Sequence, residues 1–153
     1  MKNKNPSLQE KIKKFEKICG ANGMKLTHQR MEIFREIASS DSHPSVEEIY
    51  HKLKSKLSMI SLDTVYRTLS SFENIGIISK VSVSDNKGRF DSNLIPHHHL
   101  ICTKCKVILD FYWPTFDKIK VPSETKKWGQ IFSKQVELRG ICDDCLKKHQ
   151  KKK

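Results

Sequence analysis

The nine residues from His97 to Cys105 read HHHLICTKC and carry three imidazoles and two thiols. These side chains bind transition metals strongly. A second Cys-x-x-Cys pair lies near the C-terminal end, and two such pairs can surround one zinc ion tetrahedrally with no open position for chemistry. Disulfides or redox pairs are the alternative, which the absence of a secretory signal disfavours. We therefore expect a structural zinc site formed by Cys102, Cys105, Cys142 and Cys145.

If the cysteines bind zinc, the histidines are left for a second metal. On an extended segment His97 and His99 point to one side and His98 to the other. Further candidate ligands are His43, Asp91 and Asp110. The first precedes a helix, the second ends a hairpin, and the third interrupts the apolar strand VILDFYW, where an unpaired carboxylate is costly. Each also has an ordinary reading, as a cap neighbour, a turn residue or a solvent-facing residue, so the residues alone leave this ligand set open.

Composition limits the class of protein. The chain has 153 residues, 37% hydrophobic and 30% charged, which suits one ordinary domain or two small ones. No apolar run approaches the roughly 20 residues of a membrane span, so we expect a cytoplasmic protein without a membrane partner. The net charge of +12 favours nucleic acid as a partner, although lysines of the C-terminal tail account for part of it.

The first half of the chain is expected to be helical. Apolar residues recur at helical spacing, and Cys19 lies on such an apolar face, where we expect a small core residue. The expected helices are residues 8–20, a segment capped by Thr27, a segment starting at the capping box Ser45-x-x-Glu48, and a segment from Ser61 to Gly76. A hairpin follows, with its turn at residues 85–88. This order is typical of a winged helix–turn–helix module, or of a generic small helical domain.

The second half is expected to contain short strands around one helix near residues 115–120. The expected strands cover residues 99–101, 107–112, 131–133 and 136–140. Such a small unit usually needs a metal or a partner subunit for stability. The predicted fold class is α+β. Residues 1–92 are expected to form the helical unit with its hairpin, and residues 93–153 a small α/β unit with a basic tail.

Several motifs in one order carry a specific resemblance. GMKLTHQR, HPSVEEIY, SLDTVYRTL, RFD, HHHLICTKC, ILDFY and GICDDC together resemble the ferric uptake regulator superfamily, and most closely its peroxide-sensing PerR branch. The resemblance implies a homodimer in which residues 1–92 form a winged helix–turn–helix DNA-binding domain and residues 93–153 form the dimerisation domain. It also implies a four-cysteine zinc site in the dimerisation domain and a regulatory divalent metal at the hinge. Carried over by motif, the regulatory ligands are His43, Asp91, His97, His99 and Asp110.

The resemblance implies a repressor that binds double-stranded operator DNA. Repression would end when peroxide reacts at the bound iron and oxidises one of its ligand histidines, His43 or His97. Three imidazoles and two carboxylates suit Fe²⁺ or Mn²⁺ better than zinc. Asp110 resembles PerR-type sensors, whereas iron-responsive relatives carry Glu there. A further family site looks degraded, because Pro96, His98 and Lys134 replace its expected residues. No enzyme activity and no organic cofactor are expected. The alternatives are an iron- or zinc-availability regulator and, more remotely, a non-haem iron enzyme.

DNA is expected to be read by the helix that begins at Ser61. Residues early on a recognition helix meet base edges, whereas basic residues of the hairpin reach phosphates or the minor groove. Tyr66 has an alternative role in packing against a neighbouring helix. The candidate contacts are Ser61, Thr64, Tyr66 and Arg67 on the helix, and Lys80, Lys87 and Arg89 on the hairpin.

Overall fold

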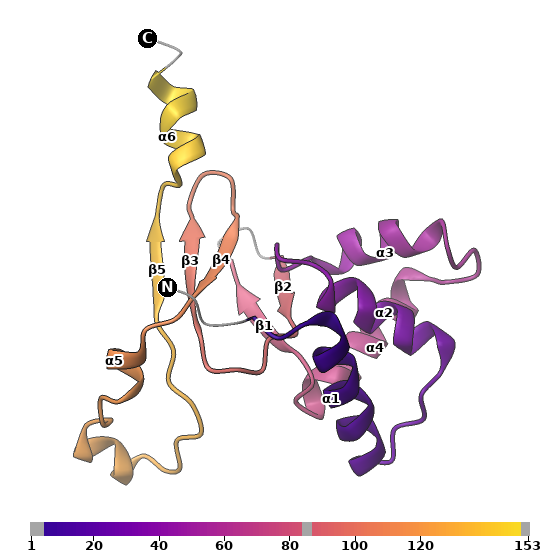
Figure 1. Cartoon of the computed structure of the whole chain (residues 1–153), viewed down its shortest axis with the longest axis horizontal. Helices are drawn as coiled ribbons and strands as arrows, with labels where there is room; N and C mark the ends of the chain where they lie inside the picture. Colours follow the sequence, from indigo (N-terminus) through magenta and orange to yellow (C-terminus); the bar gives the residue numbers. More distant parts are fainter. Residues whose placement is uncertain (1–4, 84–86, 151–153) are drawn as a thin grey trace. The chain divides into compact units, whose positions relative to one another are not determined.

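The computed structural model describes residues 5–83 and 87–150, without the side chains of the last two residues. The chain divides into two compact units, and the division falls between Leu94 and Ile95, two residues after the predicted boundary. The first unit is helical with a hairpin and the second is built on a sheet, so the predicted α+β class is confirmed (Figure 1). Among the described residues, none of the helices combines the length and apolar character needed to cross a membrane.

The helices of the first unit begin at the residues that the sequence marks as caps. They are α1 (Leu8–Ala21), α2 (His28–Ala38), α3 (Val46–Lys54) and α4 (Leu62–Asn74). Thr27 and Ser61 each accept a hydrogen bond from a backbone N–H of the first turn, which satisfies a donor that has no partner within the helix. Ser45 and Glu48 form the predicted capping box of α3.

The core of this unit is an aromatic cluster that joins three helices. The rings of Phe15 and Phe34 stack with centroids 4.1 Å apart, and Phe72 of α4 meets both edge-on. Cys19 is fully buried in the same core, as predicted. The cluster fixes α4 against α1 and α2, so the outer face of α4 is presented on a rigid support.

The predicted hairpin pairs β1 (Ser79–Ser82) with β2 (Gly88–Asp91) in antiparallel register. Of its predicted turn, Asp85 and Asn86 lie outside the described residues. The other edge of β2 is also occupied, because the backbone N–H of Phe90 donates to the Pro44 carbonyl at 3.1 Å. The segment before α3 therefore lies directly against β2.

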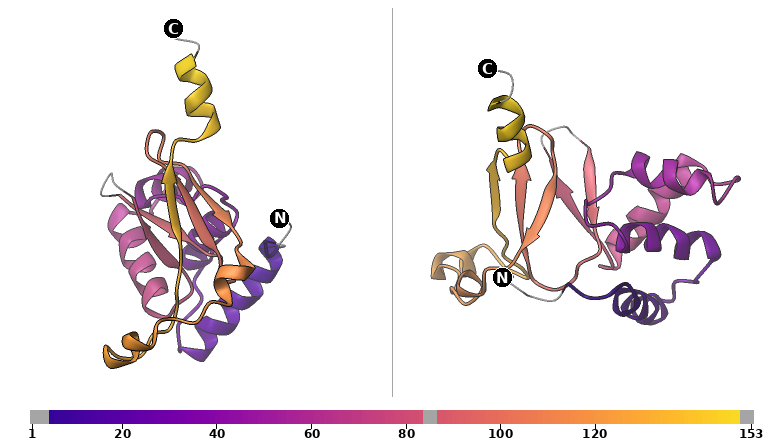
Figure 2. Two further views of the ribbon diagram at one scale, coloured as in Figure 1. Left: turned by 90° about the vertical axis from the view of Figure 1, so that its left-hand side faces the viewer. Right: turned by 45° about the horizontal axis from the view of Figure 1, so that its top comes forward.

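The second unit is a three-stranded mixed sheet with strand order β4-β3-β5. The strands are β3 (His98–Cys102), β4 (Ile108–Phe111) and β5 (Glu137–Gly140). β3 pairs antiparallel with β4 and parallel with β5. A long connection leads from β4 to β5, and at the far end of β5 the chain continues into α6 (Asp143–Gln150), which extends beyond the sheet (Figures 1 and 2).

One expected strand of this unit was wrong, and the expected helix is shorter than predicted. Residues 131–136 are described but form no strand. Instead the Lys134 ammonium donates to the carbonyls of Phe116 and Ile119, which attaches this segment to the end of α5 (Pro114–Asp117). The expected helix near 115–120 is this single turn, and a 3₁₀ turn at Ser123–Lys127 and the helix α6 were not anticipated.

Candidate metal centres and nucleic-acid interface

The four cysteines of the two Cys-x-x-Cys pairs converge at one end of the sheet. Cys102 ends β3, Cys105 lies in the turn toward β4, and the later pair lies at the start of α6. The four sulfur atoms lie within 4.8 Å of one another. Two of the separations are 4.0 Å, from Cys102 to Cys145, and 3.6 Å, from Cys105 to Cys142. A zinc ion with Zn–S bonds of about 2.3 Å places tetrahedral sulfurs about 3.8 Å apart, so the donor set fits zinc.

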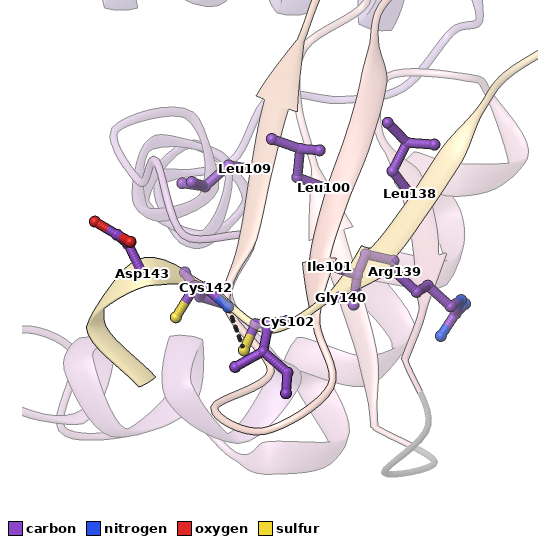
Figure 3. Close-up of a pocket in the computed structure, with 11 residues that line it drawn as sticks. Leu100, Ile101, Cys102, Leu109, Leu138, Arg139, Gly140, Cys142 and Asp143 are labelled. Carbon is purple, nitrogen blue, oxygen red and sulfur yellow. Dashed lines mark hydrogen bonds between the residues drawn. The ribbon is translucent and has the colours of Figure 1, made fainter. Parts of the chain in front are cut away.

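Electrostatics within this cluster also indicate a cation. The backbone N–H groups of Cys142 and Cys105 donate to the Cys102 sulfur and lower its pKa to about 6. Figure 3 shows the hydrogen bond from Cys142. Contact with the Cys142 thiol raises the pKa of Cys145 to about 12. The pKa of Cys142 is raised overall: the backbone N–H of Cys145 lowers it, but burial and contact with the Cys105 thiol raise it by more. One thiolate thus opposes ionisation of its neighbours, and a bound divalent cation would remove that opposition.

A second cluster of ligand atoms lies on the opposite side of β3. The Nε2 atoms of His97 and His99 are 3.0 Å apart. Asp110 pairs with His99 across the β3–β4 ladder, and its Oδ1 lies 3.7 Å and 3.5 Å from the Nε2 atoms of His97 and His99. The Nδ1 atom of His97 lies 2.7 Å from the Ile95 carbonyl oxygen. Donation from Nδ1 to this oxygen leaves the Nε2 lone pair for a metal, as expected of a ligating histidine.

His98 faces away from this cluster, as the alternation of a strand predicts. Its Nδ1 atom accepts a hydrogen bond from the backbone N–H of Val136, and its Nε2 atom lies 3.2 Å from a carboxylate oxygen of Asp117. The rings of Phe111 and Phe116 lie beside it. His98 therefore connects the β4–β5 segment to the sheet.

The remaining two predicted ligands lie together in the first unit. The Nε2 atom of His43 is 3.6 Å from Oδ2 of Asp91. His43 has a φ of 51°, in the left-handed region that a non-glycine residue seldom adopts. Oδ1 of Asp91 accepts the backbone N–H of Asn93 at 2.7 Å, which orients the carboxylate. Each unit therefore holds its own part of the predicted regulatory ligand set.

The predicted DNA contacts on α4 fall into two groups. Ser61 and Thr64 serve the helix start, because their hydroxyls are 2.8 Å apart and the Ser61 oxygen accepts the Thr64 N–H. Arg67 has an 82% exposed side chain, paired with Asp63 one turn earlier at 2.9 Å. Tyr66 is 48% exposed, which argues against a role confined to packing.

The hairpin candidates also differ among themselves. Lys80 and Lys87 are exposed. The Arg89 side chain is only 15% exposed, and its Nη1 atom donates to Oε2 of Glu48 at 2.7 Å. The two lysine side chains thus lie at the surface, whereas most of the Arg89 side chain is covered and its guanidinium is paired with Glu48.

Sequence reasoning did not identify an apolar row on the outer face of the sheet. Leu100 faces Leu109 on β4 and Leu138 on β5 in register, and these side chains are 40%, 49% and 46% exposed. They line an apolar groove of about 360 Å³ beside the cysteine cluster (Figure 3). The sequence signal for this row was a leucine on the same face of each short strand. It was not noticed because the metal-binding residues of the same strands drew the interpretation.

The model of the ferric uptake regulator family matches residues 21–139, which contain every predicted His and Asp ligand. The chain belongs to this family. A similar curated member of the ferric uptake regulator family is the peroxide-responsive repressor PerR of Staphylococcus epidermidis, which is 37% identical over 123 residues, covering 80% of this chain and 82% of that protein.

Two solved structures of ferric uptake regulator relatives resemble the fold. The Helicobacter pylori ferric uptake regulator Fur, described as having three functional metal-binding sites, aligns with a TM-score of 0.74 and 25% identity over 95% of this chain and 97% of its own. A zinc-bound manganese uptake regulator aligns with a TM-score of 0.64 and 30% identity over 83% of this chain and 97% of its own. The predicted family resemblance is thereby confirmed.

Proposed function

We propose that this protein is a metal-dependent, DNA-binding transcriptional repressor that responds to hydrogen peroxide. The observation that carries the proposal is the convergence of the His97, His99 and Asp110 ligand atoms on one face of β3. The likeness to peroxide-responsive repressors supports it. DNA as the partner implies the cytoplasm as the site of action.

One divalent ion is held jointly by the two His/Asp clusters, namely by His43, Asp91, His97, His99 and Asp110. Three imidazoles and two carboxylates suit Fe²⁺ or Mn²⁺. Since the two clusters belong to different units, an ion that binds both favours one relative arrangement of the units. It shifts that equilibrium only by its difference in affinity for the two arrangements.

When bound, Fe²⁺ would supply the redox chemistry that splits the peroxide O–O bond, so that overall one peroxide oxygen is added to a ligand imidazole and the other leaves as water. The protein contributes the positions of the imidazoles, and His43 or His97 is the residue that gains oxygen. An oxidised imidazole is a poorer ligand, so the connection between the units weakens and DNA is released. With Mn²⁺ held by the same residues, which would react far less with peroxide, the repressor should stay bound to DNA.

The cysteine cluster holds a structural zinc ion, and the protein acts as a homodimer. The sulfur separations and the pKa pattern of the thiols support zinc. The leucine row supports dimerisation, because a contiguous apolar face gains free energy when a second copy covers it. In a two-fold symmetric dimer the recognition helices address two half-sites of a palindromic operator.

The experiment compares Fe²⁺- and Mn²⁺-loaded protein before and after mild peroxide treatment. Mass spectrometry locates any added oxygen, and fluorescence anisotropy measures binding to operator DNA. We expect one added oxygen at His43 or His97, with loss of DNA binding, in the iron form only. Oxidation of the zinc-site cysteines first, with either metal, would show that the thiols are the sensor.

Two alternatives predict different outcomes. An iron- or zinc-availability regulator binds DNA according to metal concentration and is insensitive to mild peroxide. A non-haem iron enzyme consumes a substrate catalytically, so a turnover assay with the iron form separates it from a regulator. The proposed protein is not an enzyme and uses no organic cofactor.

A further inference from the structure

The ion pair between Glu48 and Arg89 lies beside the His43–Asp91 pair in the first unit. Glu48 lies in the first turn of α3, shortly after His43 in the chain. Arg89 lies two positions before Asp91 on β2, so both side chains project from the same face of that strand. The ion pair therefore joins the segment that carries one ligand to the strand that carries the other.

A single carboxylate oxygen makes this connection. Oε2 of Glu48 accepts the backbone N–H of Ser45 at 2.7 Å and Nη1 of Arg89 at 2.7 Å. Burial disfavours ionisation of Glu48, but the Ser45 N–H and the Arg89 guanidinium outweigh it and lower the pKa of Glu48. The carboxylate is thus charged at neutral pH and holds both partners through charge-assisted hydrogen bonds.

The segment under this contact is one that needs support. His43 occupies the left-handed region, and its neighbours Pro44 and Ser45 are attached to β2 by the Phe90 N–H and by a bridge to Arg89. An unusual backbone conformation persists only where surrounding contacts determine it. Loss of the ion pair would let the His43 segment move relative to β2 and separate the two ligand atoms.

We propose that Glu48 and Arg89 are positioning residues that preset the His43–Asp91 half of the regulatory metal site, and that Arg89 is not a DNA phosphate contact. This inference rests on the proposed regulatory site. The Arg89 guanidinium then orients residues that bind the metal without binding it itself. Loss of such an orienting residue typically lowers metal affinity about 10- to 100-fold.

The test measures Mn²⁺ affinity of the zinc-loaded full-length protein, without DNA, by competition with a fluorescent chelator. We expect Arg89→Met to weaken Mn²⁺ binding about 10-fold or more. Glu48→Gln retains the capping acceptor but not the charge, so we expect a smaller loss, and Arg89→Lys should restore part of the affinity. DNA binding of Arg89→Met should recover when Mn²⁺ is raised to saturation.

A matched control separates positioning from general stability. Lys52 of α3 pairs with Glu36 of α2 at 2.9 Å in the same unit, without contact to either ligand. Lys52→Met should lower the free energy of unfolding about as much as Arg89→Met while leaving Mn²⁺ affinity unchanged. Equal losses of Mn²⁺ affinity in the two variants would reduce the Arg89 effect to stability and overturn the proposal.

Two further outcomes are decisive. Unchanged Mn²⁺ affinity in Arg89→Met, Arg89→Lys and Glu48→Gln overturns the positioning role. Weaker DNA binding by Arg89→Met at saturating Mn²⁺, with a flatter salt dependence, would show that Arg89 contacts phosphate and overturns the second part of the proposal. His43→Ala tests the site itself. If His43→Ala also leaves Mn²⁺ affinity unchanged, the proposed site is wrong; if only His43→Ala weakens it, the site stands and this inference fails.

Discussion

Replacing Leu100 with Asp should weaken the proposed dimer while each subunit stays folded. Leu100 is the central residue of the exposed leucine row, between Leu109 on β4 and Leu138 on β5. The row is the apolar surface that we expect a second copy of the chain to cover. Asp at its centre removes apolar area and places a carboxylate where a partner would exclude water.

The size of the effect follows from the exposed fractions. Each leucine of the row exposes 40–49% of its surface, and complete burial of a leucine is worth about 1.5–3 kcal/mol, so covering one exposed part contributes about 1 kcal/mol. Leu100 is lost from both subunits, which removes about 2 kcal/mol per dimer and raises the dissociation constant about 30-fold. Burial of the two carboxylates adds to this loss.

Sedimentation velocity over a range of protein concentrations measures the dissociation constant. Leu26→Asp is the matched control, because Leu26 is 41% exposed in the first unit and lies outside the row. Circular dichroism and zinc content establish that both variants are folded. A folded Leu100→Asp variant with an unchanged dissociation constant, or equal weakening by Leu26→Asp, would refute the assignment of this face to dimerisation.

Two further predictions concern the zinc site and DNA. Zinc binding by metal-free protein at pH 7 should release at least two protons, because the pKa values of Cys142 and Cys145 are raised, whereas Cys102, whose pKa is about 6, should release almost none. Calorimetry in buffers of different ionisation enthalpy measures the number of protons released. Zinc affinity should fall more steeply with decreasing pH below pH 6, where Cys102 also becomes protonated. Zinc binding without proton release would contradict these thiol pKa values. Arg67→Ala should relax specificity at one base pair by about 1–3 kcal/mol, whereas Lys87→Ala should weaken binding to all sequences alike and reduce the salt slope by about one. Competition binding with single-base operator variants at several salt concentrations distinguishes the two effects. If both variants lose the same affinity for every operator sequence, Arg67 does not read a base.

Local rules account for the parts of the fold and site that the sequence predicted well. The helix starts at Thr27, Ser45 and Ser61 depend on a side-chain oxygen reaching a backbone N–H within the same turn. The opposite orientations of His97 and His98 follow from the period of a strand, and the grouping of the four cysteines follows from ligand chemistry. Each of these inferences needs only neighbouring residues or the geometry of one ion.

The missed features depend on partners far apart in the chain. Residues 131–133 include Ile131 and Phe132, which favour strands, yet Lys134 donates to carbonyls near α5 and the segment forms no strand. Arg89 has the position of a phosphate contact on a wing, yet Glu48 engages it.

The amino-acid sequence by itself therefore determined the helical order of the first unit, the thiols of the zinc site and the candidate ligands. Only the tertiary structure decided which charges were already paired and which leucines formed one surface. Cross-strand register aligned Leu100 with Leu109 and Leu138, although each belongs to a separate short strand. Helix and strand propensities and ligand spacing depend on residues a few positions apart. Ion pairs and continuous apolar surfaces form between segments that are distant in the chain, and no local sequence pattern specifies which segments come together.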